Sequence, residues 1–356
     1  MTVKRSGRLL LGAFLAAGLL FFFLRGVDWT QLGDVFRQAR PAYLVGIVAM
    51  SILTFMVRAW RWGDLIRPVV RVPYWRLVSI TYVAFMASLV IPRAAEVVRP
   101  YVVSREHKVP FAAVFASIVL ERLIDLVTVL LLFAAYLYVL PVPAAQTHGP
   151  LMHVLGVAGA FTGLGALVIG ALLLVFYNHT ERTLGLLGGL FAKLPTRFAT
   201  LLTDALRGFG EGLAVLKATP RHLAVVFGQS VLLWLCVGAT VYCSHLAFGI
   251  ALPFHASFLV IAFLTVGVAI PTPGMVGGFH EFYKLAMTEV FAVGADAAIA
   301  GGITMHFLTQ LPVLVIGLVL LSREGLTIGK VTQMSEKAAE QAGVAGAPAA
   351  SAEPQP

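Results

Sequence analysis

Two long apolar runs of this chain break at an Ile-Pro pair, the first in Ser88-Leu-Val-Ile-Pro-Arg-Ala-Ala-Glu96 and the second in Val268-Ala-Ile-Pro-Thr-Pro-Gly-Met-Val-Gly-Gly278. Each break leads into a short segment of small and charged residues, and each is followed further along by another apolar helix with polar residues. Matched interruptions of this kind indicate discontinuous membrane helices, which transporters use to build a site near the bilayer midplane.

The composition places the chain in a membrane. Hydrophobic residues make up 59% of it and charged residues 12%, whereas soluble domains average about 25% charged. The mean hydropathy is +0.89. Apolar stretches are found at 9–24, 41–57, 77–91, 118–140, 151–177, 222–247, 256–271 and 297–321. Since a spanning helix needs about 20 apolar residues, we expect an all-α polytopic membrane protein with about eight long helices plus two re-entrant, broken-helix segments.

The net charge of +9 is concentrated in connections between apolar stretches. Basic residues are in excess in Met1–Arg8, 58–76 and 178–221, while 141–150 and 246–257 contain no Lys, Arg, Asp or Glu. The positive-inside rule then predicts that both termini and the basic connections are cytoplasmic. The charge therefore indicates membrane topology, and we expect no nucleic-acid partner.

The 58–76 connection is predicted to be a cytoplasmic loop. Its basic residues are Arg58, Arg61, Arg67, Arg71 and Arg76, against one acid, Asp64. Its aromatic residues are Trp60, Trp62, Tyr74 and Trp75. Aromatic side chains beside basic ones are typical of the belt at the membrane surface.

The remaining segments complete the predicted domain organisation. We expect residues 1–326 to form one helical membrane domain whose first span is not cleaved as a secretory signal. The 181–221 segment mixes apolar and basic positions and is predicted to form short amphipathic helices on the cytoplasmic face. The tail, 327–356, is rich in Ala, Gly, Pro, Glu and Gln, and we expect it to be disordered.

The two interrupted regions form units with the same order. Residues 77–140 and 256–322 each contain an apolar entry helix, an Ile-Pro break, a short charged segment and a long exit helix. The charge distribution gives them opposite orientations, which is the arrangement of an inverted repeat with a site at the repeat interface. The alternative is two unrelated helices that both end at proline.

A first group of charges surrounds the first break: Arg93, Glu96, Arg99, Glu121, Arg122 and Asp125. Their charges sum to zero, as expected at membrane depth, where unpaired charges are costly. Glu121 and Asp125 share a helix face, and Arg93 or Arg99 could reach it. The group is either a structural ion-pair network or a polar cavity in which arginines contact a phosphate of a head group.

A second group surrounds the second break: Pro271, Pro273, Gly274, Gly277, Gly278, His280, Glu281, Lys284 and His306, with Tyr283 and Gln310 nearby. Its glycines allow sharp turns or a close backbone approach to a ligand. A helix starting near Phe279 would present free N–H groups to an anion. The alternative is a helix-breaking turn at the membrane face.

Motifs of soluble enzymes are missing from the sequence. The histidines show no metal-ligand spacing, and neither His-Glu-x-x-His, a phosphate-binding P-loop nor Gly-x-Ser-x-Gly is present. We therefore expect no catalytic residues of these classes, no metal and no cofactor.

Three segments together resemble the lysylphosphatidylglycerol synthase transmembrane-region family, also called flippase-like proteins. They are Pro92-Arg-Ala-Ala-Glu-Val-Val-Arg-Pro-Tyr101, Val119-Leu-Glu-Arg-Leu-Ile-Asp125, and Pro271-Thr-Pro-Gly274 with Gly277. The resemblance covers about residues 10–325, and the family is related to the membrane half of the multiple peptide resistance factor.

The resemblance implies a multi-pass protein of the bacterial inner membrane that moves a lipid or lipid-linked group between leaflets. The first charged group then corresponds to the family's polar core. The sequence departs from the family's usual residues at Ala95 and Met275, where glycine is common, and at His306, where many members carry arginine. The synthase domain is absent from the resemblance, so lysyl transfer is not implied.

Three functions are consistent with these features. The first is a flippase-like translocase without its own enzyme domain, driven downhill or by an ion gradient, with Glu96, Asp125 or His306 as the candidate proton carrier. The second is a non-transporting lipid-binding partner of a biosynthetic enzyme, docked through 181–221. The third is an integral-membrane transferase with a metal held by Glu121 and Asp125. The sequence leaves open the lipid (anionic, aminoacylated, isoprenoid or hopanoid-type), the direction of transport and the oligomeric state.

Overall fold

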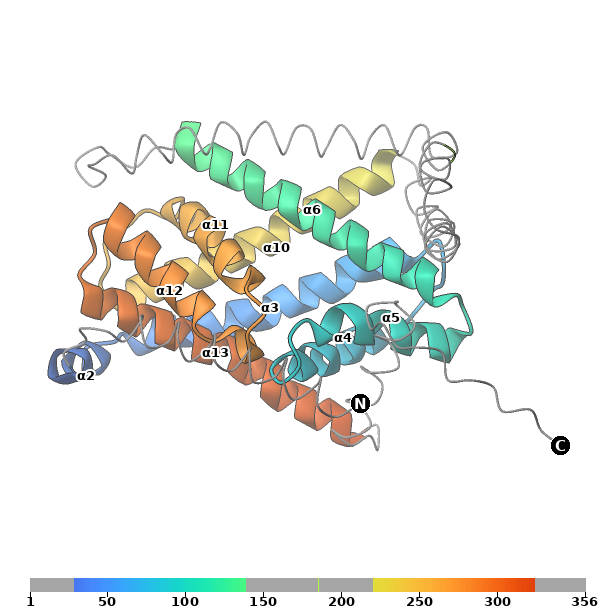
Figure 1. The fold of residues 1–356 in the computed structure, drawn as a ribbon, viewed down its shortest axis with the longest axis horizontal. Helices are drawn as coiled ribbons and strands as arrows, with labels where there is room; N and C mark the ends of the chain where they lie inside the picture. The colour runs from blue at the N-terminus through green and yellow to red at the C-terminus, as the bar shows by residue number, and fades with distance from the viewer. Residues whose placement is uncertain (1–28, 139–184, 186–219, 324–356) are drawn as a thin grey trace, which may run out of the picture.

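The computed structural model describes residues 29–138, 185 and 220–323 (Figure 1). This part of the chain is helical and contains no strand, which confirms the all-α class. Its helices are α2 (Trp29–Arg37), α3 (Pro41–Ile66), α4 (Tyr74–Ser88), α5 (Ala94–His107), α6 (Phe111–Tyr138), α10 (Pro220–Ala247), α11 (Ala256–Ala269), η3 (Pro273–Met275), α12 (Gly278–Leu285), η4 (Ala286–Val290) and α13 (Ala295–Arg323).

Three described helices, α3, α10 and α13, are long and apolar enough to cross a membrane. The 28-residue α6 is as long, but it carries the charged residues Glu121, Arg122 and Asp125. At about 1.5 Å per residue, helices of this length exceed the roughly 30 Å hydrocarbon core. The four helices run along the long axis of the bundle (Figure 1). The chain is a membrane protein.

Both predicted helix breaks are confirmed. Helix α4 ends at Ser88 and α5 begins at Ala94, and the Ser88 hydroxyl accepts a hydrogen bond from the Ala95 N–H across the gap at 2.8 Å. Helix α11 ends at Ala269, and Ile270 is extended before Pro271, as expected for a residue that precedes proline. Helices α4 and α11 have 15 and 14 residues, so each is too short to cross the hydrocarbon core alone.

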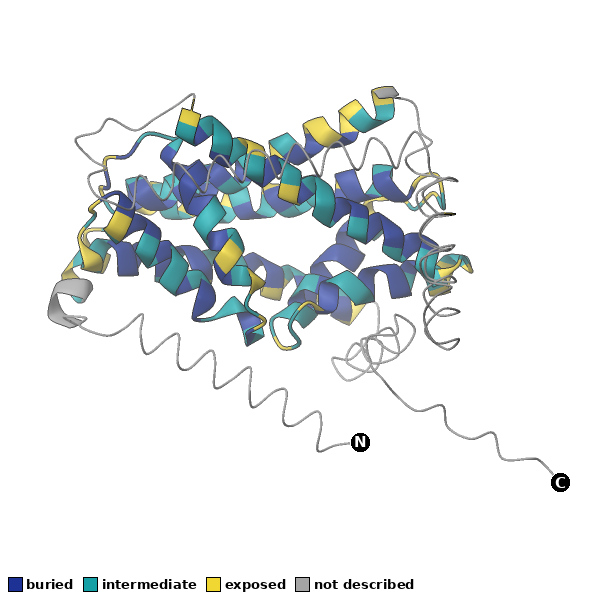
Figure 2. Ribbon diagram, turned by 45° about the horizontal axis from the view of Figure 1, so that its top comes forward, coloured by how far each residue is buried: buried dark blue, intermediate teal, exposed yellow. Residues whose placement is uncertain are grey.

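The two helix pairs form hairpins whose tips meet midway along the length of the bundle. Figures 1 and 2 show the α4–α5 hairpin and the α11–α12 hairpin entering from opposite ends. At the tips, Arg93 Nη2 donates a hydrogen bond to the Ala269 carbonyl at 3.0 Å. The Leu89 carbonyl also faces Gly274, 3.6 Å from where a Cβ on that glycine would lie. We call the α4–α5 segment the first hairpin and the α11–α12 segment the second hairpin.

Each hairpin has its own link between its two limbs. In the first, Arg76 Nε near the start of α4 donates to Glu106 Oε2 near the end of α5 at 3.1 Å. In the second, α11 and α12 cross at Gly267 and Gly278, where a Cβ on Gly267 would lie only 2.5 Å from the Gly278 carbonyl oxygen. Glycine is required there because the two backbones touch.

Three predictions about the membrane segments need correction. Residues 58–66 of the predicted 58–76 loop are helical, because α3 continues to Ile66. The apolar stretches 77–91 and 256–271 form the short hairpin helices α4 and α11 and are not long spans. Trp62 is wholly buried, and its Nε1 donates to Ser117 at 3.2 Å, so it does not belong to a surface belt.

Other predicted segments fall largely or wholly outside the described residues: the first span at 9–24, the stretch 151–177, the amphipathic segment 181–221 and the tail 327–356. Trp60 and Trp75 are exposed, and a membrane-surface belt at these two positions stays a prediction.

Candidate functional site

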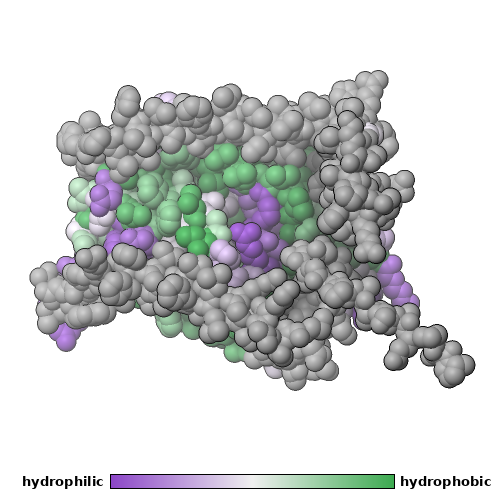
Figure 3. Space-filling model, in the orientation of Figure 1, coloured by the Kyte–Doolittle hydropathy of each residue, from purple (hydrophilic) through white to green (hydrophobic). Residues whose placement is uncertain are grey.

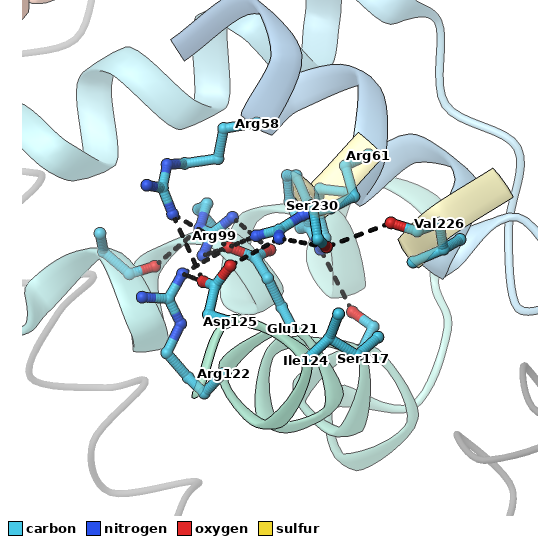
Figure 4. A network of polar contacts seen from close by, with 12 residues as sticks. Arg58, Arg61, Arg99, Ser117, Glu121, Arg122, Ile124, Asp125, Val226 and Ser230 are labelled. Carbon is cyan, nitrogen blue, oxygen red and sulfur yellow. Dashed lines mark hydrogen bonds and ion pairs between the residues drawn. The ribbon is translucent and has the colours of Figure 1, made fainter. Parts of the chain in front are cut away.

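Glu121 of α6 is the centre of a buried network of ion pairs (Figure 4). Its side chain is wholly inaccessible and lies against four arginines. Arg99 Nη1 donates to Oε2 at 3.0 Å, and Arg99 Nη2 donates to Oε1 at 3.3 Å, in a forked geometry. Arg122 Nη2 lies 2.6 Å from Oε1, and both Arg58 Nη1 and Arg61 Nη2 lie 3.4 Å from it.

Asp125, one helical turn further along α6, is the second acid of the network. Arg61 Nη1 donates to its Oδ1 at 2.6 Å, and Trp234 Nε1 donates to the same oxygen at 3.0 Å. Its Oδ2 lies 3.1 Å from Arg122 Nη2 and 3.9 Å from Arg58 Nη1. The predicted shared face of Glu121 and Asp125 is confirmed.

Neighbouring groups hold the two fully buried arginines. Arg61 also donates to the Ser230 hydroxyl of α10 at 2.7 Å. Arg99 Nε donates to the Ala95 carbonyl one turn earlier at 3.3 Å, and the Arg99 guanidinium lies over the Trp62 ring at 5.0 Å from its centroid. Arg61 and Arg99 are therefore held in place away from solvent. They fix the orientation of the two carboxylates that they contact.

We name this cluster the arginine–carboxylate site and define it by Arg58, Arg61, Arg99, Glu121, Arg122 and Asp125. It joins helices α3, α5 and α6, with α10 closing one side. Four cations face two anions, so the contacting groups carry a net charge of +2. The six predicted residues have charges that sum to zero, but the residues in contact are a different set, in which Arg58 and Arg61 replace Arg93 and Glu96.

Two predicted residues lie outside the direct contacts. Arg93 is exposed and bonds to the second hairpin at Ala269. Glu96 is half-buried in the first turn of α5 and acts on Arg122 electrostatically, but among the described residues it forms no ion pair with the four arginines.

Arg58 and Arg61 are the charged residues that sequence reasoning missed. The pattern of charges after an apolar run predicts a loop at these positions. A signal was present, since the 41–66 segment contains no internal proline after Pro41 and these arginines lie three residues apart, on one helix face. Ser230 and Trp234, from distant α10, had no comparable signal.

The second predicted group is brought together only in part. The rings of His280 and His306 stack with centroids 4.7 Å apart, and Phe279 meets His306 edge-on at 4.8 Å. His280 Nδ1 accepts a hydrogen bond from the Gly277 N–H at 3.3 Å. The start of α12 is thus partly occupied by its own side chain, which leaves fewer N–H groups for an anion than predicted.

The other members of this group have local roles. Lys284 and Glu281 form an ion pair at 3.0 Å, one turn apart on α12, and buried Tyr283 lies 3.3 Å from the Ser244 hydroxyl. Gly274 and Met275 both have φ near +60°, a conformation that favours glycine. The methionine at 275 therefore holds a strained backbone conformation at the tip of the second hairpin.

The transmembrane-region model of lysylphosphatidylglycerol synthase matches residues 9–317 of this chain. The chain belongs to this family. As a member of the lysylphosphatidylglycerol synthase transmembrane-region family, it contains both hairpins and the whole arginine–carboxylate site within the matched residues.

A curated relative of this family member is glycosyltransferase AglD of Haloferax volcanii. The two are 21% identical over 328 residues, which cover 85% of this chain and 52% of the relative. The chain therefore spans about half the length of the curated relative that it matches.

Proposed function

We propose that this protein is a flippase-like translocase that moves a lipid, or a lipid-linked head group, between membrane leaflets. The head group would pass through the arginine–carboxylate site while the acyl chains stay in the surrounding lipid. Membership of a family named for a lipid-handling membrane region supports a role in lipid or glycosyl-lipid handling. Lysyl transfer is not part of the proposal, because the family match concerns the transmembrane region.

The observation that carries the proposal is a charged cluster among apolar helices that remains open on one side. The side chains of Arg61, Arg99 and Glu121 are wholly inaccessible, whereas the Arg122 side chain is 38% exposed. Figure 3 shows hydrophilic side chains gathered within a hydrophobic face of the molecule. Charged residues within membrane helices usually mark a substrate or ion pathway. A purely structural ion pair would not need an arginine that is partly exposed.

The proposal extends to topology. We infer that the two hairpins are re-entrant segments of an inverted repeat in a bacterial inner membrane, with both termini cytoplasmic. Their entry from opposite ends of the bundle and the contact of their tips at Arg93 and Ala269 support this arrangement.

Translocation should depend on Arg122. In proteoliposomes made with a fluorescent head-group-labelled lipid, Arg122→Ala should slow transfer between leaflets by about 10- to 100-fold, the loss of one charge-assisted contact in the rate-limiting state. A leaflet-asymmetry assay with dithionite quenching measures this rate. The matched control is Arg67→Ala, which removes the same charge from an exposed residue. Equal rates for the wild type and Arg122→Ala would contradict the proposal.

One observation favours a second candidate function. The relative with a glycosyltransferase name is about twice as long as the segment that this chain matches. This chain could therefore be a membrane region that works beside a separate enzyme. In that case it would bind a lipid, without transporting it, as the partner of a lipid or envelope biosynthetic enzyme. Lipid binding and co-purification with an enzyme, without transfer between leaflets, would favour it.

The transferase with a metal held by Glu121 and Asp125 is disfavoured. Each of these carboxylates already lies against three or more basic or N–H donors. A cation would have to displace arginines that the surrounding helices hold in place.

A further inference from the structure

Arg58 and Arg122 converge on the same two oxygen atoms although they come from different helices. Glu121 Oε1 lies 3.4 Å from Arg58 Nη1 and 2.6 Å from Arg122 Nη2. Asp125 Oδ2 lies 3.9 Å and 3.1 Å from the same two nitrogens. Two guanidinium groups that share acceptors are close enough to repel each other, and the burial of both acceptor carboxylates weakens solvent screening of that repulsion.

These two arginines form the open side of the arginine–carboxylate site. Their side chains are 11% and 38% exposed, whereas those of Arg61 and Arg99 are 0% exposed. In Figure 4 they reach the carboxylates from one side, and Arg61 reaches them from the other. The buried Nε atoms of Arg58 and Arg122 have no hydrogen-bond partner within the described part of the chain. The Phe85 ring covers Arg58 at 5.2 Å.

The acids near the site do not supply the missing negative charge. Glu121 and Asp125 are shared among four arginines. Asp64, on α3, accepts a hydrogen bond from Gln229 at 2.6 Å. Glu96 reduces the positive field at Arg122 from the side of the first break, but it is not in contact with the guanidinium groups. The contacting groups thus keep their excess of two positive charges.

We propose that Arg58 and Arg122 bind a phosphate group that carries two negative charges, a phosphomonoester at the end of a lipid. This inference rests on the proposed function in taking a lipid as the carrier. A dianion bound between the two guanidinium groups would cancel the net charge of +2 and relieve their mutual repulsion. Forked Arg–phosphate contacts suit this geometry. A phosphodiester head group carries one negative charge and would leave half of the excess uncompensated.

The test compares two short-chain lipids that share a glycerol backbone. Dioctanoyl phosphatidic acid is a phosphomonoester, and dioctanoyl phosphatidylglycerol is a phosphodiester. Binding to the full chain in a non-ionic detergent is measured by calorimetry at about pH 5.5 and about pH 8. The second ionisation of a phosphomonoester falls between these values, at about 6, whereas arginine stays charged at both.

We expect phosphatidic acid to bind about fourfold more tightly at the higher pH, because the dianion rises from about a quarter of the lipid at about pH 5.5 to nearly all of it at about pH 8. Phosphatidylglycerol should bind weakly at both. Arg58→Gln and Arg122→Gln should each weaken phosphatidic acid binding about 10- to 100-fold and remove its pH dependence. Arg122→Lys keeps the charge and should keep the pH dependence at reduced affinity. The control Arg67→Gln, at an exposed position, should bind like the wild type.

Each remaining outcome decides against part of the proposal. Equal affinity for the two lipids at the higher pH overturns the dianion preference, and the proposed function survives if transfer still depends on Arg122. Equal affinity for inorganic phosphate and phosphatidic acid overturns the lipid as the source. Selective binding of phosphatidic acid without any transfer between leaflets removes the translocase and keeps the binding site.

Discussion

Glu121→Gln is expected to lower the free energy of unfolding by about 3–5 kcal/mol, the range for breaking a buried ion pair by removing one partner. Glutamine keeps the size and shape of the side chain, so the change isolates the charge. The glutamine amide keeps one acceptor oxygen and replaces the other with an NH2 donor, so Arg99 would lose one arm of its forked contact. Arg58, Arg61 and Arg122 would lose the negative charge that they share. The net charge of the site would rise from +2 to +3.

The measurement is the thermal unfolding midpoint of purified protein in detergent, together with the folded yield. Glu106→Gln is the matched control, because it removes the same charge from a partly exposed ion pair with Arg76. That pair should contribute about 1 kcal/mol or less. Equal losses from the two substitutions would show that the buried network does not depend on Glu121.

Gly267→Ala is expected to open the second hairpin and destabilise the protein by about 1–3 kcal/mol, the usual cost of inserting a methyl group where none fits. The added Cβ would meet the Gly278 carbonyl oxygen at 2.5 Å and the Phe282 Cβ at 2.9 Å. One of these atoms is backbone, so a change of rotamer cannot relieve the overlap. Because α11 carries Ala269, separation of the limbs should also weaken its contact with Arg93.

A second glycine gives the opposite expectation. Gly228 lies in α10 with nothing within 4 Å of a Cβ built on it. Gly228→Ala should therefore stabilise its helix by up to about 1 kcal/mol through helix propensity alone. Thermal unfolding of the two variants compares them directly. A Gly267→Ala protein as stable as Gly228→Ala would show that the two limbs are not in close contact.

The breaks in the hairpins could be predicted because their cause is local. Pro92 and Pro271 each interrupt an apolar run within a few residues, and proline acts on its own helix and on the residue before it. The shared face of Glu121 and Asp125 could also be predicted, since helical spacing fixes it. Both features are confirmed in the structure.

The arginines of α3 could not be assigned in the same way. A charge after an apolar run is typical of a loop, and Arg61 stays in the helix only because Asp125, 64 residues away, and Ser230, 169 residues away, compensate it. Such partners depend on how the helices pack. The same limit applies to Arg93: its position in the sequence predicts a contact with Glu121, but it bonds to Ala269, 176 residues away.

In the proposed topology, two hairpins enter the membrane from opposite sides and meet within it. Single cysteines test this in a chain where Cys236 and Cys243, the native cysteines, are replaced by alanine. Exposed positions flank both hairpins: Arg71 and Arg105 beside the first, Ala251 and Ala295 beside the second.

A membrane-impermeant maleimide applied to oriented vesicles, before and after permeabilisation, reports the side of each cysteine. The proposed topology predicts that Arg71→Cys and Arg105→Cys react from one side, and that Ala251→Cys and Ala295→Cys react from the other. Labelling of all four from one side, or of the two positions of either hairpin from opposite sides, would contradict it.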